Sequence, residues 1–166
     1  MRVLGIDPGI KNLGWGIVEG EKRKIHHLDS GVFSPTRSDD LGEKLLAIFD
    51  FLCEKIEQYQ PDLVAIESVF VSKNPRNTLR LGEVRAAAIL ACTQKKTKFK
   101  DYAPREVKKN LTGSGAANKN LVADMVCTIL KMKRQKSKLD RYDAIALAIS
   151  GIWDMQWKVN TKKHKK

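Results

Sequence analysis

The sequence is poor in cysteine and has no long apolar run. Its three cysteines, Cys53, Cys92 and Cys127, lie far apart and show no paired spacing. This spacing excludes a cysteine-based zinc site and a disulfide framework. It indicates that the cysteines are free thiols in the protein interior and that the protein works in a reducing compartment. The apolar run at residues 3–6 is too short for a signal peptide or a membrane span. We therefore expect a soluble, cytoplasmic protein.

Acidic residues are also scarce, since 19 Asp and Glu stand against 31 Lys and Arg, for a net charge of +12. The excess is uneven along the chain. Residues 39–67 contain eight acidic residues and two lysines, a net charge of −6, whereas residues 95–138 contain thirteen basic and three acidic residues, a net charge of +10. A potential this positive favours a polyanionic partner such as nucleic acid, bound by the second region.

No internal repeat is visible, and 42% apolar content in 166 residues is enough for the core of one domain. We assign that domain to residues 1–157. Residues 158–166 are basic and lack apolar anchors, so we expect them to form a disordered tail.

Hydrophobic periodicity predicts three strands followed by alternating helices and strands, the order of an α/β fold. The segment 62–67 is almost entirely apolar, as in a strand covered on both faces, and we expect it to lie centrally. Residues 113–115, Gly-Ser-Gly, are predicted as a flexible loop, and residues 38–40, Ser-Asp-Asp, as a helix cap. The predicted strands are 1–7, 13–18, 25–33, 62–67 and 98–102, and the predicted helices are 39–59, 75–94, a short one opened by Pro104, 118–131 and 140–153.

Four acidic residues occupy positions suited to a site. Asp7 and Glu67 end two predicted strands, and ligands of open α/β sheets bind outside such carboxyl ends. Asp140 and Asp143 lie three residues apart, which places both on one face of the first turn of a helix. A purely structural role as helix caps explains the last two as well, and it leaves carboxylate oxygens free.

Together the four residues would form a site of oxygen ligands only. Such a set suits hard cations such as Mg²⁺ or Mn²⁺, whereas zinc prefers histidine and cysteine. Two such ions about 3.5 to 4 Å apart can activate a water and stabilise the leaving 3′ oxygen of a phosphodiester. The acids therefore point to nuclease chemistry.

Several ordered motifs make the chain, over residues 1–153, similar to the bacterial RuvC Holliday-junction resolvases. The matching residues are Gly5-Ile6-Asp7-Pro8-Gly9, Ala65-Ile66-Glu67, Val69-Phe70, Lys73-Asn74, Tyr102-Ala103, Arg105, Val107-Lys108, Gly113, Gly115, Lys119, Asp140 and the run Asp143-Ala144 with Ala146-Leu147-Ala148. Motifs in the right order and at the right separations are far more specific than any one of them.

The resemblance implies a ribonuclease H-like fold, with a mixed five-stranded sheet of three antiparallel N-terminal strands and then alternating helices and strands. It implies a homodimer that resolves four-way junction DNA by paired nicks in opposite strands, and possible work with a branch-migration helicase complex. Two Mg²⁺ ions per active site, with Mn²⁺ as a substitute, would be bound by Asp7, Glu67, Asp140 and Asp143. Lys108 and Lys119 would contact or stabilise the scissile phosphate.

The resemblance also indicates DNA contacts after the fourth strand. Phe70 matches an aromatic residue that stacks on junction bases, although a place in the core or in a dimer interface is the open alternative. Lys73, Arg76, Arg80 and Arg85 would contact the DNA backbone.

The chain departs from its relatives at two places. Ala86 follows Val84-Arg85 where relatives commonly have glycine, which we expect to alter helix packing or DNA approach. Ser150-Gly151 stands where several relatives carry a histidine, so a mechanism assisted by a C-terminal histidine is in doubt for this chain.

Three other functions remain open at this point. The pattern Asp7-x-Gly9-x-x-x-x-Gly14 resembles the phosphate-binding hairpin of actin-like ATPases and sugar kinases, but those proteins need two such domains and more than 166 residues. A protein that binds branched DNA without cutting it would gain nothing from four acids near phosphate. A nuclease that cuts RNA or single-stranded DNA is compatible with the same residues.

Overall fold

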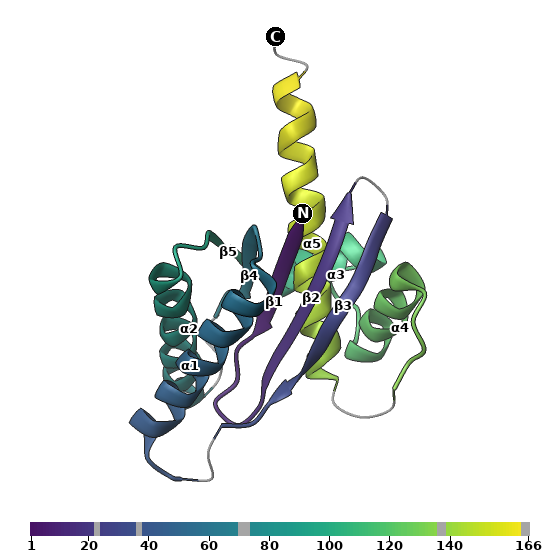
Figure 1. Cartoon of the computed structure of the whole chain (residues 1–166). Helices are drawn as coiled ribbons and strands as arrows, with labels where there is room; N and C mark the ends of the chain where they lie inside the picture. The colour runs from purple at the N-terminus through teal and green to yellow at the C-terminus, as the bar shows by residue number, and fades with distance from the viewer. Residues whose placement is uncertain (22–23, 36–37, 70–73, 136–138, 164–166) are drawn as a thin grey trace.

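The computed structural model describes residues 1–21, 24–35, 38–69, 74–135 and 139–163, with side chains through residue 156. The elements follow the predicted order (Figure 1). They are β1 (Arg2–Asp7), β2 (Leu13–Glu21), β3 (Lys24–Phe33), α1 (Leu41–Tyr59), β4 (Leu63–Glu67), α2 (Pro75–Gln94), β5 (Phe99–Tyr102), α3 (Pro104–Thr112), α4 (Lys119–Leu130) and α5 (Asp140–Lys163).

The five strands form one mixed sheet in the order β3-β2-β1-β4-β5. β1, β2 and β3 pair antiparallel, whereas β4 pairs parallel with β1 and with β5. β4 therefore lies inside the sheet, as its apolar sequence predicts. The α/β fold with three antiparallel strands followed by alternating helices and strands is confirmed.

Side chains of β1 and β4 alternate between the two faces of the sheet, as the two-residue period of a strand requires. Val3, Leu63 and Ala65 face a core formed with α3, α4 and α5. Leu4 and Val64 face a second core formed with α1 and α2, which lie on the left of Figure 1. Because parity fixes the face, the odd-numbered Asp7 and Glu67 point to the side of α3, α4 and α5.

Close contact between α5 and the sheet depends on glycine. Gly5 of β1 pairs with Gly16 of β2, and the backbone of α5 crosses directly over them. A Cβ atom on Gly5 would lie 1.9 Å from the carbonyl oxygen of Ala144, and one on Gly14 would lie 2.3 Å from that of Asp140. The absent side chains let the first turns of α5 reach the end of β1.

The helix ends follow their capping residues. Asp40 accepts a hydrogen bond from the backbone N–H of Glu43 at 2.8 Å and so begins α1.

The last helix is longer than predicted, because α5 continues ten residues past the predicted end at Trp153 and ends at Lys163. Residues 158–163, which we expected to be part of a disordered tail, are therefore helical. No glycine or proline follows Gly151, so each further residue adds a helical hydrogen bond at little cost. Although α5 projects beyond the sheet, neither it nor any other described helix has the length and apolar content to cross a bilayer.

We predict that Gly5→Ala lowers the free energy of unfolding by about 3 kcal/mol, because the new methyl group meets backbone that cannot move aside without shifting α5. Denaturant unfolding measures this directly. Gly82→Ala in α2 is the matched control: no atom lies within 4 Å of the added Cβ, and helix propensity favours alanine. Equal stability of the two variants would contradict the close packing of α5 on β1.

Candidate active site

Asp7 and Glu67 lie side by side at the carboxyl ends of two neighbouring parallel strands. Ile6 of β1 pairs with Ile66 of β4, so the next residue of each strand carries its carboxyl group to the same edge and the same face. The two carboxyl groups share a hydrogen bond. Burial, followed by the negative charge of Glu67, raises the pKa of Asp7 well above its usual range. Burial also raises the pKa of Glu67.

The first turn of α5 brings the other two predicted acids to this edge. Asp140 begins the helix and Asp143 follows three residues later on the same face. Gly14 pairs with Asp7 across β1 and β2 and leaves room for the backbone of Asp140. Asp7, Asp140 and Asp143 each offer a carboxylate oxygen, and these oxygens lie within 4.8 Å of one another. The structure therefore assembles all four acids, with Glu67 joined through Asp7.

This arrangement suits a cation. Asp143 is partly buried, and burial raises the pKa of its carboxyl group despite the lysine beside it. Buried like charges disfavour ionisation unless positive charge compensates them. The four side chains offer only carboxylate oxygens as ligands. A hard divalent cation such as Mg²⁺ or Mn²⁺ suits these ligands and would neutralise their negative charge.

Lys119 supplies part of the positive charge from the start of α4. Its Nζ lies 2.9 Å from Asp143 and 3.2 Å from Asp140. Burial disfavours the charged amine, but the hydrogen bonds and charges of both aspartates outweigh burial and raise the pKa of Lys119. The two ion pairs hold the Lys119 side chain at the acids. Because that side chain is still 52% exposed, a substrate can reach it.

Lys108 reaches the same acids from α3. It lines a small cavity together with Glu67 and Asp143, and its positive charge partly opposes the rise in pKa that burial causes in both carboxyl groups. The two lysines that the resemblance identified thus lie on separate helices, and both lie beside the acids.

A polar pocket of about 550 Å³ opens beside the acids. Besides Asp7, Lys119 and Asp140, it is lined by residues of the turn between β1 and β2 and of the first turns of α2. Sequence reasoning identified Arg80 among these but missed Lys11, Asn12 and Asn77. The closeness of Lys11 and Asn12 to Asp7 in the chain was an available signal, whereas nothing in the sequence placed Asn77 here.

The remaining predicted DNA contacts have different surroundings. Arg76 is exposed in the first turn of α2, and Arg80 is half-buried and pairs with Glu83 at 3.0 Å. Arg85 makes two hydrogen bonds to Asp101 of β5, at 2.6 and 3.1 Å, so an intramolecular ion pair occupies it. Phe70 and Lys73 lie outside the described residues.

The two departures from the relatives lie away from the acids. Ala86 is exposed in a groove between α1 and α2, so its methyl group does not disturb the packing of α2 on the sheet. Ser150 is buried, and a Cβ on Gly151 would lie 2.8 Å from Val3. Ser150 is seven residues beyond Asp143, about 10 Å along the helix. This segment of α5 serves packing against β1.

Comparison with known proteins agrees with this geometry. Residues 3–151 match the protein family described as Crossover junction endodeoxyribonuclease RuvC. A relative with that name from Legionella pneumophila is 40% identical over 147 residues, which cover 89% of this chain and 84% of the relative. Another from Actinobacillus succinogenes is 43% identical over 148 residues, covering 89% and 77%.

Two solved structures have the same fold with high similarity. Thermus thermophilus RuvC is 30% identical, with a TM-score of 0.83 over 93% of this chain and 96% of that one. The same protein in complex with a Holliday junction substrate is 29% identical, with a TM-score of 0.88 over 95% and 96%. The match over most of the chain and the acids at the carboxyl edge of the sheet lead to one conclusion: this chain belongs to the RuvC family of crossover junction endodeoxyribonucleases.

Proposed function

We propose that this protein is a metal-dependent endonuclease that resolves Holliday junctions by paired nicks in opposite strands, through a nuclease domain of residues 1–157. The observation that carries the proposal is the convergence of carboxylate oxygens from Asp7, Asp140 and Asp143 within 4.8 Å, beside Glu67 and two lysines. Family membership supports the Holliday junction as the substrate, because the structure of a relative with the same fold was determined in complex with a Holliday junction.

The four acids would hold Mg²⁺, with Mn²⁺ as a substitute and two ions as the expected number. A divalent cation bound there supplies a polarised phosphoryl oxygen and an activated water. Asp7 lies between the strand-end acid Glu67 and the two acids of α5, so it is the ligand that connects both halves of the set. Asp140 and Asp143 are held by the helix, which fixes the spacing of their carboxyl groups.

The lysines act on the substrate. Lys119 pairs with Asp140 and Asp143, and Lys108 lies beside Glu67 and Asp143, where an ammonium group can stabilise the negative charge that develops on the phosphoryl oxygens. The pocket beside the acids is lined by Lys11, Asn77 and Arg80, and the exposed Arg76 is the neighbour of Asn77 in α2. These side chains can hold a DNA strand by its phosphates. None of these contacts would read base sequence.

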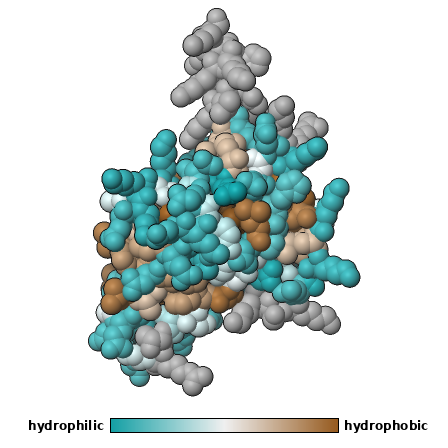
Figure 2. All heavy atoms as spheres, in the orientation of Figure 1, coloured by the Kyte–Doolittle hydropathy of each residue, from teal (hydrophilic) through white to brown (hydrophobic). Residues whose placement is uncertain are grey.

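A homodimer would place two such sites on one junction. The groove between α1 and α2 is lined almost entirely by apolar side chains, and apolar residues gather over these helices on the left of Figure 2. Leu46 and Leu90, on the two walls, are 59% and 60% exposed. A surface of this kind is typical of an interaction face, and we assign it to a second copy of the chain.

Cleavage of a synthetic four-way junction tests the proposed reaction. We expect the wild type to nick two opposite strands in Mg²⁺ or Mn²⁺ and not in EDTA, and Asp7→Asn to lower the rate at least 10²-fold while still binding the junction. Gel analysis of labelled strands measures both. Asp39→Asn, the same substitution at an exposed carboxylate, is the control and should cut normally.

Three outcomes would count against the proposal. Full activity of Asp7→Asn would place the active site elsewhere. Tight junction binding by the wild type without cutting would indicate a binding protein. Equal attack on RNA or single strands would indicate a different substrate.

Without metal, the buried carboxyl group of Asp7 makes the stability of the protein depend on pH. Since the pKa of Asp7 is raised by folding, the folded state binds its proton more tightly than the unfolded state, and stability falls as pH rises from the ordinary carboxyl range through the raised pKa. Asp7→Asn removes this penalty, and its amide can still donate to Glu67. In EDTA at pH 7 we expect the variant to be more stable by about 0.5 to 2 kcal/mol, with no gain near pH 3.

Thermal unfolding across pH tests this. Adding Mg²⁺ should stabilise the wild type and leave Asp7→Asn nearly unchanged, because only the wild type retains the full ligand set. A variant less stable than the wild type in EDTA at pH 7 would mean that Asp7 has a structural role.

A substitution in the α1–α2 groove tests the proposed dimer. We expect Leu90→Glu to convert a dimer into a monomer, because it puts a charge in the α1–α2 groove, and to uncouple the two nicks. Sedimentation at micromolar concentration measures the mass. Leu28→Glu, on an exposed leucine of β3, should leave the dimer intact. Dissociation by both variants, or a monomeric wild type, would refute the assignment of this groove.

A further inference from the structure

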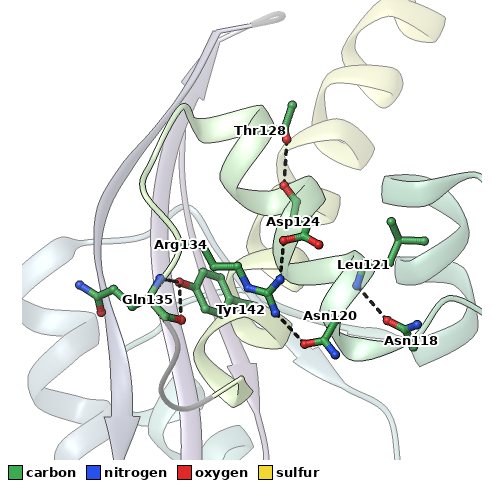
Figure 3. Close-up of polar contacts among 8 residues, drawn as sticks. All are labelled: Asn118, Asn120, Leu121, Asp124, Thr128, Arg134, Gln135 and Tyr142. Carbon is green, nitrogen blue, oxygen red and sulfur yellow. Dashed lines mark hydrogen bonds and ion pairs between the residues drawn. The ribbon is translucent and has the colours of Figure 1, made fainter.

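The chain between α4 and α5 is hydrogen-bonded to the first turn of α5. Tyr142 is fully buried, and its phenolic oxygen accepts a hydrogen bond from the backbone N–H of Gln135 at 2.7 Å and donates to the carbonyl of the same residue at 3.4 Å. The side chain of Gln135 accepts a further hydrogen bond from Arg141. Figure 3 shows Tyr142 reaching out of α5 to the backbone of Gln135. Gln135 is thus fixed to both residues that separate Asp140 from Asp143.

The neighbouring residue fixes the same segment to α4. The guanidinium of Arg134 donates to Asp124 at 2.5 Å and to Asn120 at 2.6 Å, two side chains one helical turn apart (Figure 3). Two nitrogens of one planar group meet two separate acceptors, which restrains direction as well as distance. The start of α4 is further ordered by Asn118, which accepts from the backbone N–H of Leu121 at 2.9 Å.

These bonds close a ring around the catalytic edge. Lys119, next to Asn120 on α4, contacts Asp140 and Asp143 of α5. Arg141 and Tyr142, between those aspartates in sequence, hold Gln135, and Arg134 returns to α4. The two helix starts are therefore joined on one side by the catalytic ion pairs and on the other by Arg134, Gln135 and Tyr142.

We propose that Arg134, Gln135 and Tyr142 are positioning residues that set the distance between Lys119 and the metal-binding acids of α5. None of the three touches the acids through its own functional group; each acts through the helix start that it restrains. The proposal rests on the nuclease function proposed above and names further residues needed for that reaction.

The physical reason is the precision that catalysis requires. Apolar packing of α4 against α5 is non-directional and tolerates small sliding between the helices. A misplacement of about 1 Å of a catalytic group costs up to 10²-fold in rate. Directional hydrogen bonds to a buried tyrosine and to a bidentate arginine restrain the sliding that apolar packing leaves free.

Tyr142→Phe is the first test, because it keeps the buried ring and removes the hydroxyl group. We expect kcat for junction cleavage to fall about tenfold with KM changed less than twofold, and the Mn²⁺ concentration for half-maximal thermal stabilisation to rise. Tyr59→Phe is the matched control: its hydroxyl donates to Asp29 at 2.6 Å and ties α1 to β3 away from the acids. A tyrosine with a merely structural role would lower only the melting temperature, as we expect for Tyr59→Phe.

Arg134 gives a second test on an exposed residue, which guards against loss of folding. Arg134→Gln and Arg134→Lys should both lower kcat and weaken Mn²⁺ stabilisation, because lysine retains the charge but not the two-point geometry. The adjacent Lys133→Gln controls for loss of one positive charge near DNA. A rise in KM alone for Arg134→Gln, fully rescued by lysine, would make Arg134 a DNA contact and overturn its positioning role.

The experiments distinguish a failure of the positioning role from a failure of the proposed junction cleavage. A wild type that fails to cut junctions refutes the proposed function, whereas Mn²⁺ stabilisation still reports on the positioning residues. A wild type that cuts, together with Tyr142→Phe kinetics and Mn²⁺ dependence equal to those of Tyr59→Phe, refutes the positioning role alone.

Discussion

The contact of the α5 backbone with the glycines of β1 and β2 is the constraint on which the rest of this structure depends. Gly5 and Gly14 have no side chain to hold the helix away from the sheet, and the carbonyl oxygens of Ala144 and Asp140 occupy that space. The first turn of α5 consequently lies over the end of β1. A sheet that carried ordinary side chains here would hold Asp140 and Asp143 too far from Asp7 to share a cation.

The same closeness creates an electrostatic conflict inside the folded protein. Burial and mutual repulsion raise the pKa of Asp7, Glu67 and Asp143, so the fold brings together charges that disfavour one another. Lys119 offsets part of this charge, and the divalent cation that we propose for this site would offset the remainder. In the proposed function, the stability that the metal-free protein loses at the acids would favour binding of the cation, a common relation between stability and activity in enzymes.

Groups on five different elements meet at this edge. The strand ends of β1 and β4 supply two acids, α5 supplies two, and α3 and α4 supply one lysine each. The segment of Arg134 and Gln135 joins α4 to α5, so the relative position of acid and lysine is restrained from two sides. The polar pocket beside the acids opens toward α2, which connects the chemistry to the surface where we place the DNA strand.

The sequence by itself determined the elements, the faces and the acids. Periods of two and 3.6 residues are local properties, so the strands, the helices and the shared face of Asp140 and Asp143 could be predicted from neighbouring residues alone. The two-residue period of the strands also places Asp7 and Glu67 on the same face of the sheet, once the two strands are known to be parallel. The roles of Lys108 and Lys119 came from resemblance, since a lone lysine carries no local signal.

Only the tertiary structure decided which distant groups meet. It paired Arg85 with Asp101, brought Asn77 to the pocket beside the acids, and joined Tyr142 to Gln135. These contacts depend on the angle and separation of packed elements, which are set by the shape of the whole core and are not encoded in any short stretch of sequence.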